Sequence, residues 1–467
     1  KKVIAIVENK LPENFNTPQK QKKAILQEIE VAKKTGNEIE DEEGKKINKI
    51  FDSKDPDLQK FIRKILQSID EKNDRILPTE TPADCLYTFV ELFVFKCLSD
   101  LGILEQGTNF DHLLERYKYD IDKPEEKALE YYVKTIRPEI KRLFPESKID
   151  GTTIINGTIF VSKGKAVTEY GLVFKKVLLR FKDYKKLENI SYDFKSQLFE
   201  TFLKEDKGKK DWGQFFTPLK VVRAIIKMAK DDIREGIEIC DPACGVGKFL
   251  LEALITSSKK LDHLYDKDKK KLKITIHGFD KGTDEGEQRT IILAKANMLI
   301  YFSELIKENP KLTEDFSKLF NDSFVIKTNP VLGTLAEPEK DKYDLILTNP
   351  PYVISGSGNL KDKIREKDSL SNYYKIDASG FEGLFMEWII RALKPNGKAF
   401  VVIPDGILNR KNDQKLRQFI INECFIDGII SLPNKTFFNT SKKTYILCLT
   451  KKNSKGDVQT DPVFTYL

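Results

Sequence analysis

The sequence is poor in histidine and cysteine. Three histidines and six cysteines occur in 467 residues, and the cysteines are scattered, mostly in apolar strings, without a Cys-x-x-Cys pair. Zinc sites need clustered ligands and disulfide frameworks need paired cysteines, so the sequence favours neither. Scattered unpaired cysteines are typical of a reducing environment, and we therefore expect a cytoplasmic protein.

Long apolar runs are also missing. No stretch approaches the length needed to cross a membrane, and no signal-peptide pattern opens the chain. A hydrophobic content of 40% with 33% charged residues is typical of a globular protein without a membrane partner. The net charge of +8 has the sign that suits nucleic acid, although a solvated basic surface would give the same value.

Residues 1–50 carry a pattern of their own. A strand-like run at residues 3–7 delivers Glu8 and Lys10 and is followed by a helical stretch. This arrangement resembles the core of PD-(D/E)xK nucleases, which implies that Glu8 helps to hold Mg²⁺ while Lys10 polarises the attacking water. No second acid precedes Glu8, so a surface turn is the competing interpretation. We interpret residues 1–50 as a remnant of such a domain, with Mg²⁺ expected only on that interpretation.

The remaining chain divides into two regions. Residues 51–205 show mainly helical spacing of apolar side chains, whereas residues 206–467 alternate strands with helices, which predicts a parallel α/β sheet. The predicted strands are 237–240, 274–279, 343–347, 399–403, 425–431 and 445–450, the last two paired antiparallel. The predicted helices of this region include 249–261, 290–302, 381–393 and 414–422.

The loop at residues 241–248 joins the first of these strands to a helix. Its two glycines, Gly245 and Gly247, allow a sharp turn and a close approach of the backbone to a ligand. A dinucleotide fingerprint would need a third glycine at Leu250, and a P-loop would need glycine in place of Pro242. The loop therefore matches neither the dinucleotide fingerprint nor the P-loop. The acid at Asp241 suits a ligand that carries an amino group.

Two further acids occur later in the chain. Asp280 stands at a predicted strand end, where acids commonly accept hydrogen bonds from ribose hydroxyls. Asp322, with Phe324 close behind it, suits an adenine amino group and the face of its ring. Ordinary turn chemistry is the alternative interpretation at both positions.

A rigid tetrapeptide, Asn349-Pro350-Pro351-Tyr352, directly follows the strand predicted at 343–347. Open α/β sheets place ligands at the carboxyl ends of their strands. The prolines fix their own φ angles and restrict the residue before them, so acceptor oxygens here are held in place beside the Tyr352 ring. The segment is therefore either a clamp for a flat ligand with an amino group or a simple loop stop.

Together with Gln214-Phe215-Phe216-Thr217-Pro218, these motifs resemble, in order and spacing, the DNA methyltransferases that make N6-methyladenine. From about Trp212 to Leu449 the chain is similar to the modification subunits of type I restriction–modification systems and to the methylase part of type IIG enzymes. The resemblance implies a Rossmann-like S-adenosylmethionine-dependent methyltransferase sheet preceded by a mainly helical domain. It also implies a site-specific, adenine-specific DNA methyltransferase with double-stranded DNA as partner.

The resemblance assigns the cofactor site residue by residue. S-adenosylmethionine would be bound by Gln214, Phe215, Phe216, Thr217, Pro218, Asp241, Gly245, Val246, Gly247, Asp280 and Asp322. Thr217 and Pro218 are also predicted to cap and begin a helix. Two positions depart from the family pattern. Lys248 replaces a small residue, and Phe324 follows Asp322 by two positions instead of one.

The resemblance places catalysis at Asn349, Pro350, Pro351 and Tyr352. Acceptors on Asn349 and Pro350 would hold both N–H groups of the adenine amino nitrogen and aim its lone pair at the donor methyl group. The base must leave the duplex to reach them, and it would stack on Tyr352. The resemblance gives Phe437 as a second stacking ring, with burial of this side chain as the alternative.

Three functions stay open on the sequence alone. The first is methylation of adenine in DNA within a restriction–modification system. The second is a non-autonomous assembly subunit, because few residues follow Leu449 for a target-recognition domain; a specificity subunit or a missing carboxyl-terminal domain would supply it, with a restriction subunit as a further partner. The third is a fragment of a bifunctional nuclease–methyltransferase.

Overall fold

The computed structural model describes residues 82–120, 122–155, 158–183, 217–257, 264–266, 268–281, 289–327, 329, 331–352, 357–376, 378, 380–434, 436–437 and 442–466. The predicted nuclease residues Glu8 and Lys10 lie outside the described residues. So do Gln214, Phe215, Phe216 and the predicted boundary between residues 205 and 206.

The first part of the described chain is mainly helical, as expected. Its helices are α4 (Pro82–Asp100), α5 (Phe110–Tyr119), α6 (Pro124–Tyr131), α7 (Arg137–Leu143) and α8 (Gly171–Asp183). A short hairpin of β1 (Val161–Ser162) and β2 (Lys165–Ala166) precedes α8. Its turn is tight because Lys163 and Gly164 both have positive φ angles, of 47° and 76°. No helix in the described part of the chain is both long and apolar enough to cross a membrane.

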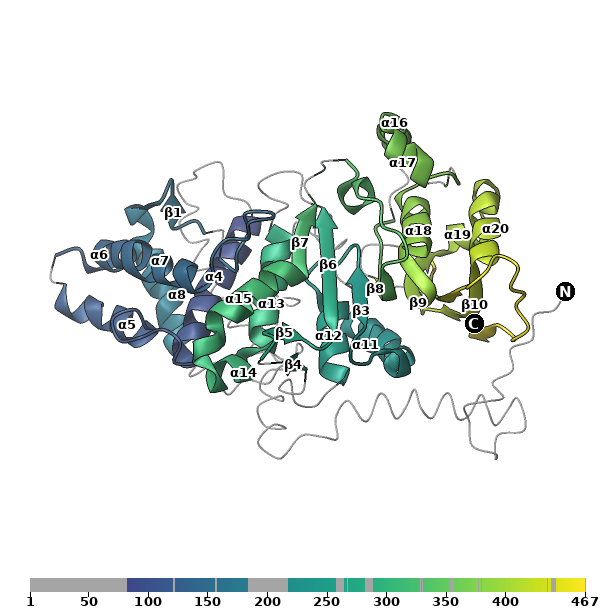
Figure 1. Cartoon of the computed structure of the whole chain (residues 1–467). Coiled ribbons are helices and arrows are strands. Elements are labelled where there is room, and N and C mark those ends of the chain that lie inside the picture. Colours follow the sequence, from purple (N-terminus) through teal and green to yellow (C-terminus); the bar gives the residue numbers. More distant parts are fainter. Residues whose placement is uncertain are drawn as a thin grey trace.

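An eight-stranded sheet forms the centre of the molecule (Figure 1). Its strands are β3 (Glu238–Asp241), β6 (Thr275–Lys281), β7 (Phe324–Lys327), β8 (Tyr343–Thr348), β9 (Leu393–Pro404), β10 (Cys424–Ser431), β11 (Thr444–Lys451) and β12 (Phe464–Tyr466). The order is β12-β10-β11-β9-β8-β3-β6-β7, and β11 runs antiparallel to both of its neighbours. The other pairs are parallel, so the predicted α/β sheet is confirmed. A separate two-stranded sheet joins β4 (Tyr265–Asp266) to β5 (Lys271–Leu272).

Helices cover both faces of the sheet. They are α11 (Leu219–Met228), α12 (Lys248–Ser257), α13 (Arg289–Tyr301), α14 (Ser303–Glu308), α15 (Thr313–Ser323), α16 (Ser357–Arg365), α17 (Asp368–Tyr373), α18 (Gly380–Ala392), α19 (Asp405–Asn409) and α20 (Gln414–Glu423). Adjacent strand residues point to opposite faces. Leu347 accordingly packs in the cluster that contains α11, α12 and α13, and Ile346 packs in the cluster that contains α18 and α20.

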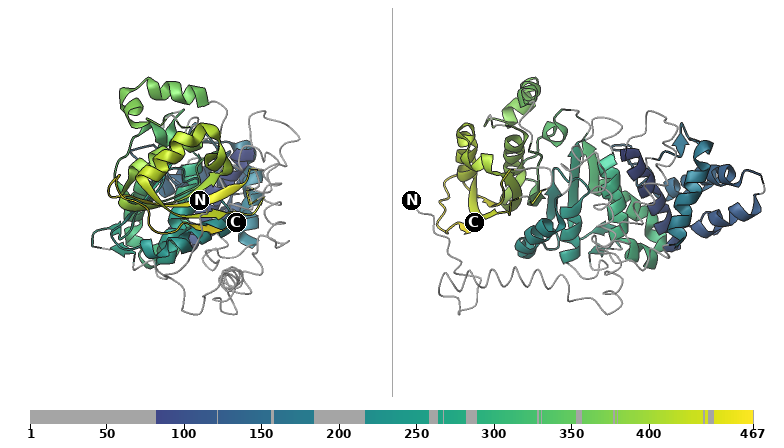
Figure 2. Two further views of the ribbon diagram at one scale, coloured as in Figure 1. Left: turned by 90° about the vertical axis from the view of Figure 1, so that its right-hand side faces the viewer. Right: turned by 180° about the vertical axis from the view of Figure 1, so that it is seen from behind.

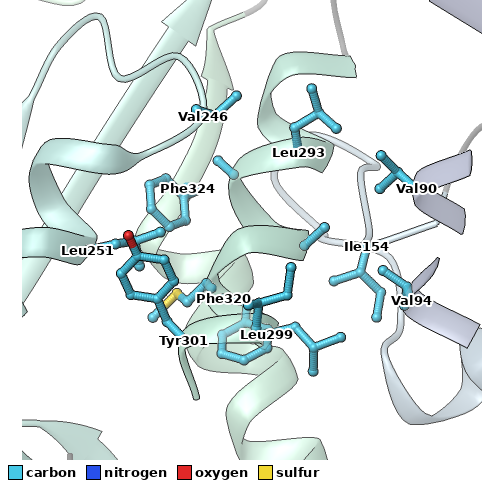
Figure 3. Close-up of a cluster of buried hydrophobic side chains, with 14 of the residues drawn as sticks. Val90, Val94, Ile154, Val246, Leu251, Leu293, Leu299, Tyr301, Phe320 and Phe324 are labelled. Carbon is cyan, nitrogen blue, oxygen red and sulfur yellow. The ribbon is translucent and has the colours of Figure 1, made fainter. Parts of the chain in front are cut away.

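The helical part continues the core of the sheet domain beyond β7. Figures 1 and 2 show α4 to α8 gathered at the β7 end of the sheet, next to α13 and α15. In the close-up of Figure 3, Val90 and Val94 of α4 lie next to Ile154, and Leu293 of α13 is nearby. All four side chains belong to one apolar cluster. Because these buried residues belong to one apolar cluster, the helical part is fixed to the sheet rather than tethered to it.

Candidate functional site

The carboxyl ends of β3, β6 and β8 meet at one edge of the sheet, because the three strands are parallel neighbours. A pocket of about 380 Å³ opens at this edge. Its lining comprises Thr217, Asp241, Ala243, Cys244, Gly245, Val246, Lys248, Phe249, Asp280, Lys281, Thr290, Asn349, Pro351 and Phe381. Residues that lie more than a hundred positions apart in the chain, and that the sequence assigned to one site, therefore share one cavity.

The loop between β3 and α12 forms one wall of the pocket. Gly245 and Gly247 both adopt left-handed conformations, with φ angles of 51° and 78°, which residues with a side chain rarely adopt. The backbone amide of Cys244 donates to the Phe279 carbonyl at 2.8 Å, and the Asn297 side chain donates to the Val246 carbonyl at 3.0 Å. The loop is therefore held from β6 and α13, and its shape exists before any ligand binds.

Phe324 supports this loop from below. Its side chain is fully buried, and Figure 3 shows its ring between Val246 and Leu251. A β-carbon added to Gly247 would lie 2.6 Å from the Phe324 ring. Phe324 is thus a packing residue for the loop. Its spacing of two positions from Asp322, where the family has one, goes with this packing role.

Replacing Gly247 by alanine is expected to destabilise the fold by at least about 2 kcal/mol, from a positive φ angle plus a steric clash. Gly236 provides a matched control, because it has a φ angle of 87° and no atom within 4 Å of an added β-carbon. The Gly236→Ala variant should lose only about 1 kcal/mol. Urea unfolding measures both. Equal losses in the two variants would show that Phe324 does not constrain the loop.

Asp241 is the buried acid of the pocket. Burial raises the pKa of its carboxyl group to about 7, and the nearby Thr348 hydroxyl and Ala243 amide oppose the rise. Oδ1 accepts from the Ala243 amide at 3.1 Å, whereas Oδ2 has no hydrogen-bond partner among the described residues. A buried acceptor without a partner is costly, so this oxygen suits a ligand that brings a cationic or N–H donor.

Lys248 occupies the first position of α12 and is buried. Burial lowers the pKa of its ammonium group to about 7, and the Glu252 carboxylate one turn along the helix opposes this shift. Glu252 in turn accepts from Arg223 at 3.1 Å and from the Tyr301 hydroxyl at 3.2 Å. The lysine that departs from the family pattern therefore lies in a partly buried charge network between α11, α12 and α13.

Asp280 faces the same pocket from β6, and its Oδ1 accepts the Lys281 amide at 2.8 Å. Several lining residues had no role in the sequence prediction, notably Lys281, Thr290 and Phe381. Phe381 belongs to the first turn of α18. In the sequence, Phe381 fits the apolar pattern of a helix in the same way as a core residue does. Only the position of α18 at the pocket edge shows that Phe381 lines the pocket.

The tetrapeptide after β8 holds a chain of side-chain hydrogen bonds. The Asn349 amide nitrogen donates to the Thr217 hydroxyl at 3.0 Å, and the Tyr352 hydroxyl donates to Asn349 Oδ1 and, at 3.4 Å, to the Val402 carbonyl. Burial raises the pKa of Tyr352 well above its ordinary value, so the phenol keeps its proton. Asn349 and Pro351 line the pocket, whereas Pro350 and Tyr352 are not among the lining residues.

The predicted helix cap at Thr217 is wrong. Helix α11 begins at Leu219, Pro218 takes the N-cap position, and no side chain caps the helix. The proline is one position earlier than expected, so the Thr217 side chain lies outside the first turn. Its hydroxyl faces Asn349 instead.

Two other predicted residues lie away from the pocket. Asp322 is exposed in the last turn of α15, before β7 starts, and the parallel register pairs Asp280 with Ile326. Asp322 is therefore on the side of the amino end of β7, whereas the pocket lies at the carboxyl ends. Phe437 is buried in the larger apolar cluster and does not line the pocket. Its position agrees with the packing alternative.

Comparison with known proteins assigns the chain to a family. The profile of the N-6 DNA Methylase family matches residues 190–466. This range includes the glycine loop, all the lining residues of the pocket and the Asn-Pro-Pro-Tyr segment. The chain belongs to this family. The family membership predicted from the motifs is confirmed, and with it the methyltransferase type of the α/β fold.

Two similar proteins are methylase subunits of type I restriction enzymes. The chain is 28% identical over 269 residues to the EcoEI methylase subunit of Escherichia coli, which covers 56% of this chain and 47% of that protein. It is 25% identical over 373 residues to the EcoKI methylase subunit of the same species, covering 78% and 64%. The chain thus spans about half to two thirds of these relatives.

A solved structure supports the same fold. The type I restriction–modification methyltransferase subunit from Streptococcus thermophilus is 18% identical and has a TM-score of 0.53. The match covers 87% of this chain and 90% of that one. The helical part therefore belongs to the shared architecture as well as the sheet.

Proposed function

We propose that this chain methylates the N6 amino group of adenine in double-stranded DNA, with S-adenosylmethionine as methyl donor, within a restriction–modification system. One observation carries the proposal. The pocket at the strand ends holds the glycine loop, two acids and the Asn349 amide side by side. The assignments of individual residues below are part of the same proposal.

The residues of the pocket fit the cofactor. The buried Oδ2 of Asp241 lacks a partner among the described residues and suits the ammonium group of the methionine part. The left-handed glycines Gly245 and Gly247 bring the backbone close to that part, and Asp280 suits the ribose hydroxyls. When bound, S-adenosylmethionine supplies an electrophilic methyl group on a sulfonium centre. Asp322 has no part in this proposal, because it lies at the other end of β7.

Asn349 and Pro350 would act on the target amino group. The nitrogen is a poor nucleophile because its lone pair is delocalised into the adenine ring. An acceptor on each N–H group favours a tetrahedral nitrogen and directs the lone pair outward. Oδ1 of Asn349 has two lone pairs, of which the Tyr352 hydroxyl uses one, so the other can accept from the base. The prolines restrict the backbone that carries the Pro350 carbonyl, and Thr217 and Tyr352 hold the Asn349 side chain.

The adenine amino group lies inside the duplex, so the base must turn out of the helix to reach Asn349. Tyr352 would provide a stacking surface for it. The buried position of Phe437 gives no support to a second stacking role, and Phe381 is an aromatic residue that does line the pocket.

We further propose that target recognition requires a partner protein. The similar proteins are named methylase subunits, which indicates that they function in assemblies. A specificity subunit would fit the second function left open by the sequence, and a restriction subunit is a further candidate. The interpretation of Glu8 and Lys10 as nuclease residues stays a prediction from the sequence.

A methyl-transfer assay tests the proposed function. The full chain is incubated with tritium-labelled S-adenosylmethionine and DNA that lacks N6-methyladenine, alone and together with any DNA-recognition protein that copurifies with it. We expect label in N6-methyladenine after digestion to nucleosides. Label confined to cytosine or to RNA would contradict the proposal, as would absence of transfer in both conditions. Transfer by the isolated chain would exclude the assembly-subunit alternative.

Cofactor affinity is expected to depend on pH through Asp241. Below its pKa of about 7 this carboxyl group is neutral, and only the carboxylate can pair with the ammonium group of the ligand. The dissociation constant of S-adenosylhomocysteine should therefore rise by up to about tenfold per unit as the pH falls from 7 to 5.5. Calorimetric titration measures it. The Asp241→Asn variant should bind weakly and lose this part of the pH dependence, and parallel profiles would contradict the assignment.

A further inference from the structure

The hydroxyl of Thr217 lies between the cofactor loop and the proposed base clamp. Thr217 lines the same pocket as Asp241 and Asp280, and its Oγ1 accepts from the Asn349 amide nitrogen at 3.0 Å. Helix α11 does not use this hydroxyl as a cap. The two residues are 132 positions apart in the chain, so their contact is a product of the fold.

The contact holds the nitrogen end of the Asn349 amide. An asparagine side chain has an acceptor end and a donor end of almost the same shape, and its hydrogen-bond partners decide between the two orientations. Here Thr217 takes the nitrogen, and the protonated Tyr352 hydroxyl donates to the oxygen. An amide turned by 180° would present N–H groups to an adenine amino group and could not hold it.

We propose that Thr217 is a positioning residue for Asn349, whose amide it orients so that Oδ1 is available to the target amino group. The role rests on the proposed methyl transfer and goes beyond a contact between Thr217 and the cofactor. Thr217 also lines the cofactor pocket, so one hydroxyl borders both the cofactor site and the clamp.

A double-mutant cycle on the single-turnover rate tests this role at saturating cofactor, with the full chain and its DNA-recognition partner. The Thr217→Val variant keeps the size of the side chain and removes the acceptor, and it should lower the rate by about tenfold, the effect of about one hydrogen bond. Thr217→Ser keeps the hydroxyl and should stay within about threefold of wild type. In the Asn349→Ala background, Thr217→Val should change the residual rate by less than about threefold.

Three outcomes would overturn the role. They are a Thr217→Val rate equal to that of wild type, a serine variant as slow as valine, and an equal loss in the Asn349→Ala background. A loss confined to the S-adenosylhomocysteine dissociation constant, with an unchanged rate at saturation, would assign Thr217 to the cofactor alone. Thr217→Ala replaces the valine variant if valine does not fold. If the wild-type protein transfers no methyl group, the proposed function is wrong. This result differs from the outcomes that contradict only the role of Thr217, because all of those require an active wild-type protein.

Discussion

Replacing Asn349 by alanine is expected to lower the rate of methyl transfer about a hundredfold to a thousandfold, the usual effect of removing one preorganised polar group from a catalytic site. The amide is held on both sides, by Thr217 and by Tyr352, so it is positioned before the reaction begins. The affinity for S-adenosylhomocysteine should change much less, because the proposed cofactor contacts come from other strands. Single-turnover rates and calorimetry measure the two quantities separately.

Asn396 offers a matched control for this experiment. It is exposed near the start of β9, and its side chain donates to Asn453 Oδ1 at 3.0 Å. The Asn396→Ala variant should therefore transfer methyl groups at the wild-type rate. If Asn349→Ala retained a rate within about tenfold of wild type, equivalent to about 1.4 kcal/mol of barrier, the clamp mechanism would be wrong.

Replacing Lys295 by methionine is expected to destabilise the protein by about 3–5 kcal/mol, because the change leaves a buried carboxylate without its cation. The side chains of Lys295 and Asp150 are fully buried, with Nζ and Oδ1 3.6 Å apart. Nζ also donates to the Thr152 hydroxyl at 2.7 Å and to the Asn321 side chain at 2.8 Å. Asp150 accepts the Ile326 amide of β7 at 2.9 Å, so the network joins the helical part to the edge strand β7.

An exposed ion pair serves as the comparison. Lys134 and Glu130 are 2.8 Å apart on the surface of the helical part, and Lys134→Met should lose less than about 1 kcal/mol. Urea unfolding of both variants measures the difference. A loss below about 1 kcal/mol for Lys295→Met would show that the buried pair does not hold the two parts together.

The same lysine has a pH signature. Burial lowers the pKa of Lys295 to about 8 from a reference value of 10.5. Between these values the unfolded chain binds more protons than the folded chain, so this group makes the folded state more stable as the pH rises. Lys295→Met should lose this contribution, which is obtained as the difference between the two stability profiles.

Much of the site could be predicted from the chain because its residues are local in sequence. The loop with Gly245 and Gly247 needs glycine for its own backbone angles, and Asn349 with its prolines is rigid by itself. Each follows a strand with a clear apolar pattern. The rule that ligands bind at the carboxyl ends of parallel strands then brings them together without knowledge of side-chain contacts.

Asp322 and Phe437 show where such prediction stops. The strand β7 has four residues, too few for a periodic pattern to separate it from the preceding helix. It is absent from the predicted strands, so the sequence did not show that Asp322 lies at the amino end of a strand. Phe437 stands in a motif, but its burial depends on which strands surround it. Neither fact can be read from neighbouring residues, because both depend on partners that are distant in the chain.

The sequence by itself determined the family, the α/β sheet, the glycine loop and the Asn-Pro-Pro-Tyr segment, since these depend on backbone angles and on periodicities within a few residues. Only the tertiary structure decided the contact of Thr217 with Asn349, the packing of Phe324 under the loop and the buried pair of Lys295 with Asp150. Each of these joins segments that the sheet and its helices bring together. Long-range contacts depend on the register and packing of whole elements, which a local pattern does not contain.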